Sequence, residues 1–208
     1  MQRDFLGEDK DMNIYSFVRN NSVLETDLLG LVSVSESDCR EAVNSAWKKS
    51  RDIAVLVDKL KSHNPPCKVP TVYCVCCRDA NLGGGYYDRK NKIEICYNHI
   101  SSVSDLLQIY LHELIHGWNE CNGFGGESCD EAVCDEILSY YYSGGCQSGG
   151  DPGQGDKSIW DCVIRRAADS AQDYCKKPGE TMNQANYNAR KRGWAVLRSC
   201  LRNAPKPN

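Results

Sequence analysis

The hydrophobic positions recur with a helical period over several long stretches of the chain. The first stretch carries five apolar residues near one helical face: Ala42, Ala46, Ile53, Val57 and Leu60. Asn64 and the two prolines after it end that pattern. Ser104 is the expected N-cap of the second helix, with Asp105 in its first turn. We predict helices over residues 39–63, 104–119, 129–142, 159–175 and 180–201.

A strand pattern lies between the first two predicted helices. Residues 69–77 alternate and are rich in β-branched side chains, which predicts a strand. The glycines at 83–85 indicate a turn or bulge, and residues 86–88 and 92–97 are expected to form a hairpin around 89–91.

These elements predict an α+β fold in which a small sheet or hairpin packs on a helix, with further helices after it. The glycine-rich segment 144–155 is expected to be a flexible loop, too short to separate two domains. We therefore predict one domain over residues 39–208. Residues 1–38 are polar and mixed, and are expected to form a loosely ordered N-terminal arm with one short helix.

The composition is that of a globular protein with a sizeable core. The 208 residues are 41% hydrophobic and 25% charged, with a net charge of −3. This balance gives no electrostatic footprint for nucleic acid. The apolar runs are too short to cross a bilayer. The first twelve residues have neither the pattern of a secretory signal nor that of an ordinary transit peptide.

Thirteen cysteines set this chain apart from ordinary cytosolic proteins. One interpretation is a disulfide framework, and the other is a cysteine-rich zinc site around residues 72–79. The wide scatter of the cysteines, without the paired C-x-x-C spacing of zinc ribbons, favours disulfides. Because the number is odd, at least one thiol should remain unpaired. Disulfides without a secretory signal suggest an unusual compartment such as the mitochondrial intermembrane space.

The motif His-Glu-Leu-Ile-His at residues 112–116 carries the candidate chemistry. On a helix, His112 and His116 share one face and can bind one metal ion. Glu113 is then placed to act as the general base toward a metal-bound water, as in zinc hydrolases. The alternative is a helix that carries two ordinary histidines.

A catalytic zinc needs a third protein ligand. The downstream acidic candidates are Glu127, Asp130, Glu131, Asp135 and Glu136. Glu136 falls within the apolar arc of its predicted helix, where a carboxylate is costly unless it is paired or binds a metal. Its spacing of twenty residues from His116 is similar to that of thermolysin-like enzymes. The alternative is a buried Glu136 paired with Arg165 or Arg166.

Two further features bear on this site. Tyr140 and His99 are candidates to stabilise an oxyanion. The predicted hairpin over 83–97 precedes the motif helix, which is where zincins carry the strand that pairs with the peptide substrate. A purely structural hairpin is the alternative.

Four blocks in order resemble a known family: HELIH at 112–116, AVCDEI at 132–137, SGGC at 143–146 and CVIRRA at 162–167. Upstream, GGGYYD and KIEICYNHI fit as well. The chain resembles the mitochondrial inner-membrane metallopeptidases of ATP synthase assembly over residues 39–200.

The resemblance implies a zincin-like zinc protease, peripheral on the inner membrane in the intermembrane space and held by several disulfides. It implies a peptide or membrane-protein subunit as substrate, and subunits of ATP synthase or a respiratory complex as partners. His112, Glu113 and His116 carry over as ligand, base and ligand, and Glu136 as the acid of the second block.

The sequence departs from the family pattern near the motif. Asn119 stands where the family usually has aspartate, Asn122 where it has arginine, and Glu131 where it has histidine. Leu138 replaces a further arginine. The chain therefore presents two alternatives: an active zinc endopeptidase, with Glu131 also available as an oxygen ligand, or a catalytically degenerate assembly factor or structural subunit of a respiratory or ATP synthase complex on the same fold.

Overall fold

The computed structural model describes residues 33–78, 83–87, 90–126, 128–146, 154–203 and 206–207. The predicted N-terminal arm lies almost wholly outside these residues. The elements in order are α1 (Glu36–Lys49), α2 (Arg51–Ser62), β1 (Thr71–Val75), β2 (Gly84–Tyr87), β3 (Lys92–Cys96), the 3-10 helix η2 (Tyr97–His99), α3 (Val103–Cys121), α4 (Cys129–Tyr142), α5 (Ile159–Cys175) and α6 (Met182–Asn203).

The three strands form one small mixed sheet in the order β1-β3-β2. β1 runs parallel to β3, and β2 runs antiparallel to it with Tyr86 opposite Ile93. The predicted hairpin is therefore confirmed. Ile93 and Ile95 of the central strand β3 are fully buried and belong to the first hydrophobic core.

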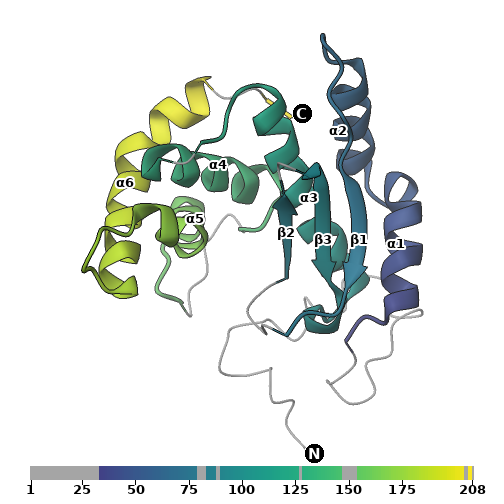
Figure 1. Ribbon diagram of the computed structural model, residues 1–208, viewed down its shortest axis with the longest axis horizontal. Coiled ribbons are helices and arrows are strands. Elements are labelled where there is room, and N and C mark those ends of the chain that lie inside the picture. Colours follow the sequence, from purple (N-terminus) through teal and green to yellow (C-terminus); the bar gives the residue numbers. More distant parts are fainter. Residues whose placement is uncertain are drawn as a thin grey trace, which may run out of the picture.

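Helix α3 lies between two groups of elements (Figure 1). On one side are the sheet, α1 and α2, which share a core with α3. On the other side α4, α5 and α6 pack around a second core that includes Val133, Ile137 and Ile164. The predicted α+β class, with a small sheet packed on the motif helix and more helices beyond it, is confirmed.

The helix predicted over 39–63 is wrong in one respect, because it is two helices. Ser50 ends α1 with extended backbone angles, and its side chain accepts a hydrogen bond from the Ile53 amide to cap α2. A serine that satisfies a free amide in this way favours a new helix start over a continuous helix. The second N-cap was also misplaced: Ser102, not Ser104, caps α3 and accepts from the Asp105 amide.

The glycines at 83–85 were expected in a turn or bulge, but Gly84 and Gly85 lie within β2. A Cβ at Gly84 would stand 2.9 Å from the Ile109 side chain and 3.0 Å from the Glu94 carbonyl oxygen. Because glycine has no Cβ, β2 can approach both α3 and β3 closely. The glycine run thus brings the edge of the sheet against the motif helix.

All thirteen cysteines are among the described residues, and twelve of them form six disulfides. Cys76 is the unpaired one, as the odd number predicts. Three disulfides join residues up to Cys121, and three join residues from Cys129 onward: Cys39–Cys74, Cys67–Cys121, Cys77–Cys96, Cys129–Cys175, Cys134–Cys200 and Cys146–Cys162. None of them links the two sets, so α3 and α4 meet through non-covalent contacts.

Candidate metal and peptidase site

The motif histidines lie on α3 where it meets α4. Leu106 and Leu114 anchor α3 in the first core. The spacing of four residues places His112 and His116 on one face, and their Nε2 atoms are 3.1 Å apart. Both side chains are nearly buried, at 12% and 11% exposure. Two imidazole nitrogens that face each other at this distance are arranged as a pair of ligands for one cation.

Glu136 completes this group from the facing helix. Helix α4 begins and ends as predicted, and its capping box of Ser128 and Glu131 fixes the first turn. Glu136 lies with Oε2 at 3.4 Å from His112 Nε2 and Oε1 at 3.8 Å from His116 Nε2. The ligand atoms of these three residues all lie within 4.8 Å of one another. The structure therefore brings together the three residues proposed as ligands from the sequence.

The alternative predicted from the sequence, an ion pair between Glu136 and Arg165 or Arg166 of α5, is not found among the described residues. The guanidinium of Arg165 pairs with Asp156 at 2.8 Å. The guanidinium carbon of Arg166 lies 6.0 Å from the centre of the Tyr140 ring. The carboxylate of Glu136 instead faces the two histidines.

Asp135, one of the acidic candidates for the third ligand in the sequence, instead contacts the Nδ1 atom of His116. Its Oδ2 lies 2.7 Å from His116 Nδ1, and its Oδ1 accepts a hydrogen bond from Asn119 Nδ2 at 2.6 Å. Ser139 Oγ is 3.2 Å from the same His116 nitrogen. A carboxylate on Nδ1 holds a proton there, so Nε2 is the nitrogen that faces Glu136 and His112. The contact depends on how α3 and α4 pack, which helical spacing alone did not reveal.

Burial and neighbouring charges shift the pKa values of His116, Glu136 and Glu113. Burial opposes protonation of His116, but the carboxylates of Asp135 and Glu136 outweigh it and raise the pKa to about 10. Burial also acts to raise the pKa of Glu136, yet His116 and His112 lower it overall. Burial raises the pKa of Glu113, with His112 and His116 opposing. The site thus holds two carboxylates with opposite pKa shifts, the pattern that separates a proton-transfer group from a permanently charged one.

Glu113 faces the sheet edge. Its side chain is buried, and the backbone of Tyr86 in β2 hydrogen-bonds to the carboxylate. A Cβ at Gly84 would lie 3.6 Å from Glu113 Cγ. β2 is an edge strand of the described sheet, and at Gly84 it packs against the side chains of Ile109 and Glu113 on α3.

The two residues suggested for an oxyanion have different surroundings. Tyr140 packs its ring on His112, with ring centres 4.4 Å apart, while its hydroxyl hydrogen-bonds Ser170 on α5. Burial raises the pKa of Tyr140 to about 12, so its hydroxyl stays protonated. His99 lies in η2, where its Nε2 is 2.9 Å from the Cys77 carbonyl oxygen. Of the two, only Tyr140 touches the histidine group.

A second set of potential ligands comprises His63, Cys67 and Cys121. Cys67 and Cys121 form a disulfide with each other, so neither offers a thiolate. The His63 ring nitrogens contact Pro65 and Asn122. The His112 group is therefore the better candidate among the described residues.

Comparison with known proteins places the chain in a family. The model of the Peptidase M76 family matches residues 37–192. The chain belongs to the Peptidase M76 family. A curated protein of Lodderomyces elongisporus, named mitochondrial inner membrane protease ATP23, is 32% identical over 133 residues, which are 60% of this chain and 54% of that protein. The chain thus spans about half the length of this relative. No solved structure matches it.

The family assignment confirms the resemblance seen in the sequence, and the departures can now be placed. Asn119 donates to Asp135, and Asn122 hydrogen-bonds the Trp118 carbonyl at the end of α3. Glu131 is exposed, and its carboxylate forms the capping box with Ser128 at the start of α4. Leu138 is fully buried. None of the four departures displaces His112, His116 or Glu136 from their group.

Proposed function

We propose that this member of the Peptidase M76 family is a zinc endopeptidase. His112, His116 and Glu136 would hold the metal, and Glu113 would act as the general base. The observation that carries the proposal is that two motif histidines of α3 and a largely buried carboxylate of α4 bring their ligand atoms within 4.8 Å of one another. Two imidazoles with one carboxylate make up a ligand set typical of catalytic zinc, which keeps a further position open.

The surroundings of the ligands fit a cation. Glu136 Oε2 is buried and, among the described residues, has no well-aligned hydrogen-bond donor, although His112 Nε2 lies 3.4 Å from it and Ser170 on α5 hydrogen-bonds the carboxylate. A buried carboxylate oxygen without an aligned donor is costly unless a cation lies beside it. The Asp135 carboxylate hydrogen-bonds His116 Nδ1, the nitrogen that faces away from the other two candidate ligands, as the partners of metal-bound histidines do. Bound zinc would supply Lewis acidity and lower the pKa of a coordinated water toward neutrality.

The residues of this chain would move the protons. Glu113, with a raised pKa, would accept the proton of the attacking water and deliver it to the amine of the leaving peptide. The Tyr86 backbone fixes the carboxylate in position for this transfer. The edge of β2 would bind an extended substrate through main-chain hydrogen bonds beside Glu113.

The proposed setting follows from the resemblance and from the name of the relative. We propose that the protein acts peripherally on the mitochondrial inner membrane, from the intermembrane space, and processes and helps to assemble a membrane subunit of ATP synthase. Among the described helices, none is both long and apolar enough to cross a bilayer.

Metal removal tests the proposal on the full chain. We expect one zinc per chain and hydrolysis of a broad peptide library, both lost after chelation and both restored by adding zinc. Metal analysis and mass spectrometry of the products provide the measurement. Zinc without hydrolysis of any peptide would favour the degenerate assembly factor, and a folded protein without zinc affinity would refute the metal site.

Asp135→Asn should weaken zinc binding about 10- to 100-fold, the usual effect of losing the partner of a metal-bound histidine. The substitution keeps the shape of the side chain but removes the charge that orients His116. Zinc affinity is measured by competition with a chelator. Asp130→Asn removes the same charge from the exposed first turn of α4 and should leave zinc affinity unchanged. Equal affinities in both variants would assign Asp135 a purely structural role.

A further inference from the structure

The outward face of α6 combines two exposed aromatic side chains with several cations. Tyr187 and Trp194 are 62% and 50% exposed and lie seven residues apart, which places them on the same side of the helix two turns apart. Single exposed aromatic rings are common on protein surfaces, but here two of them share one face of a helix. The pair marks this face as a candidate contact surface.

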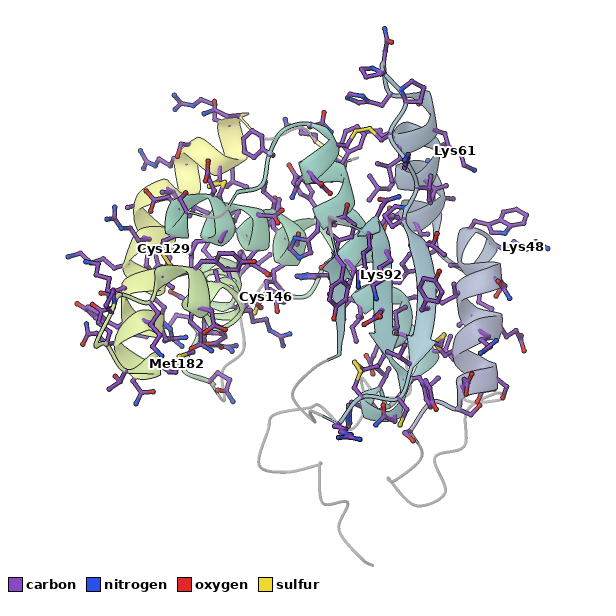
Figure 2. All side chains as sticks on the ribbon, in the orientation of Figure 1. Lys48, Lys61, Lys92, Cys129, Cys146 and Met182 are labelled. Atoms are coloured by element: carbon purple, nitrogen blue, oxygen red, sulfur yellow. A yellow bond between two sulfur atoms is a disulfide. The ribbon has the colours of Figure 1, made fainter. Side chains whose placement is uncertain are left out.

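Helix α6 is also strongly basic. Between Met182 and Asn203 it contains no aspartate or glutamate, whereas the whole chain has a net charge of −3. Its five cations are Arg190, Lys191, Arg192, Arg198 and Arg202. At about 100° per residue, all of them except Arg192 fall within roughly 60° of Tyr187. Figure 2 shows nitrogen-tipped side chains along this outer side of α6.

The opposite side of α6 fixes this face outward. Ala185, Ala189 and Gly193 are fully buried against the second core. A Cβ at Gly193 would stand 2.9 Å from Ile164 Cδ1 on α5, so the helix packs very closely there. The small residues hold α6 on its neighbours, and the Cys134–Cys200 disulfide ties it to α4. The basic aromatic face is therefore presented on a rigid support.

The cations of this face are largely uncompensated. Arg190 has a long pairing with Asp169 at 3.9 Å, and both groups are about half exposed. Arg192, at the flank, pairs with Asp130 at 3.5 Å. Within the described part of the chain, Lys191, Arg198 and Arg202 form no ion pair. These three charges surround the aromatic pair and remain available to a partner.

We propose that this face of α6 binds the anionic surface of a phospholipid bilayer. Exposed cations are attracted to anionic headgroups, while tryptophan and tyrosine settle at the level of the headgroups. The positive charge of this face complements the anionic headgroups of a bilayer, and its two exposed rings can lie at the level of those headgroups. The apolar area is small, so the attachment is electrostatic, reversible and sensitive to salt.

The inference specifies the membrane contact of the proposed function. It does not depend on the proposed chemistry, because the face contains no residue of the metal group. Trp47 on α1 provides a contrast: it is 59% exposed, but α1 carries three acidic and three basic residues. Exposure of a tryptophan is thus shared by both helices, and the unbalanced positive charge is particular to α6.

Vesicle flotation of the full chain tests the proposal. We expect binding to phosphatidylcholine vesicles that contain phosphatidylserine, little binding to phosphatidylcholine alone, and release by high salt. The double substitution Lys191→Gln/Arg198→Gln should weaken binding about 30-fold, since each cation near an anionic surface contributes about a factor of five. Trp194→Ala should weaken it further.

Matched variants are available on the other side of the molecule. Lys61→Gln/Lys68→Gln removes two exposed charges near α2, where Figure 2 labels Lys61, and Trp47→Ala removes the exposed ring of α1. Both should bind vesicles as wild type does. Thermal unfolding and zinc content should be unchanged in every variant. Absence of binding to the anionic vesicles, or equal loss in the α2 variant, would overturn the proposal, and binding only to an acidic protein would do so as well.

Discussion

Glu113→Gln should lower kcat for peptide hydrolysis by about 10²- to 10⁴-fold, the contribution of a general base, with zinc still bound. Glutamine has nearly the shape of glutamate, and its carbonyl can still accept the hydrogen bond from the Tyr86 backbone. It cannot take a proton from water at neutral pH. Because Glu113 is buried against the sheet while Glu136 lies beside the two histidines, the proposed base and the proposed metal ligand can be tested separately.

The measurement joins zinc content with initial rates on one cleaved peptide. Glu41→Gln removes an equal charge from an exposed position on α1 and should match wild type in both. Hydrolysis near the wild-type rate in Glu113→Gln would show that another group takes the proton. Loss of zinc together with activity would show that the substitution acts through the metal site, and the role of general base would then fail.

The parts of the site that follow from local rules were predictable from the sequence. The bounds of α4 and α5 were predicted as they stand in the structure, because caps and apolar spacing act over a few residues. The same periodicity put Glu136 on the buried side of α4. Its approach to His112 and His116 then depends on α4 packing on α3, which the structure shows.

What depends on contacts between distant segments could not be predicted in the same way. Asp135 was only one of five acidic candidates in the sequence, and its hydrogen bond to His116 arises from the crossing of two helices. Gly84 and Gly85 have little intrinsic tendency to form strands, yet they pair with β3 because α3 requires a close approach. The disulfide partners likewise depend on the folded arrangement, because thirteen cysteines permit many pairings.

Glu136→Gln should weaken zinc binding more severely than loss of an outer partner, by more than about 100-fold, and activity should fall with it. The neutral amide is a poor ligand, and Glu136 supplies the only acidic side chain of the group. Excess zinc should restore part of the activity, which it cannot do for a missing base. At a zinc concentration that saturates wild type but not this variant, zinc should raise the melting temperature of wild type more than that of the variant, because ligand bound to the folded state stabilises it.

Glu131→Gln is the matched control for Glu136→Gln, because Glu131 is the other acid of α4 considered as a ligand and stands where the family usually has histidine. In the structure Ser128 Oγ donates to Glu131 at 2.6 Å, and glutamine can maintain this capping box. Zinc affinity and the zinc-induced rise in melting temperature should therefore equal those of wild type. In the proposed site, a metal would link His112 and His116 of the first disulfide-bonded set to Glu136 of the second. If Glu131→Gln lost zinc and Glu136→Gln kept it, the first turn of α4 would have to move onto the histidines, and the ligand set proposed for this fold would be wrong.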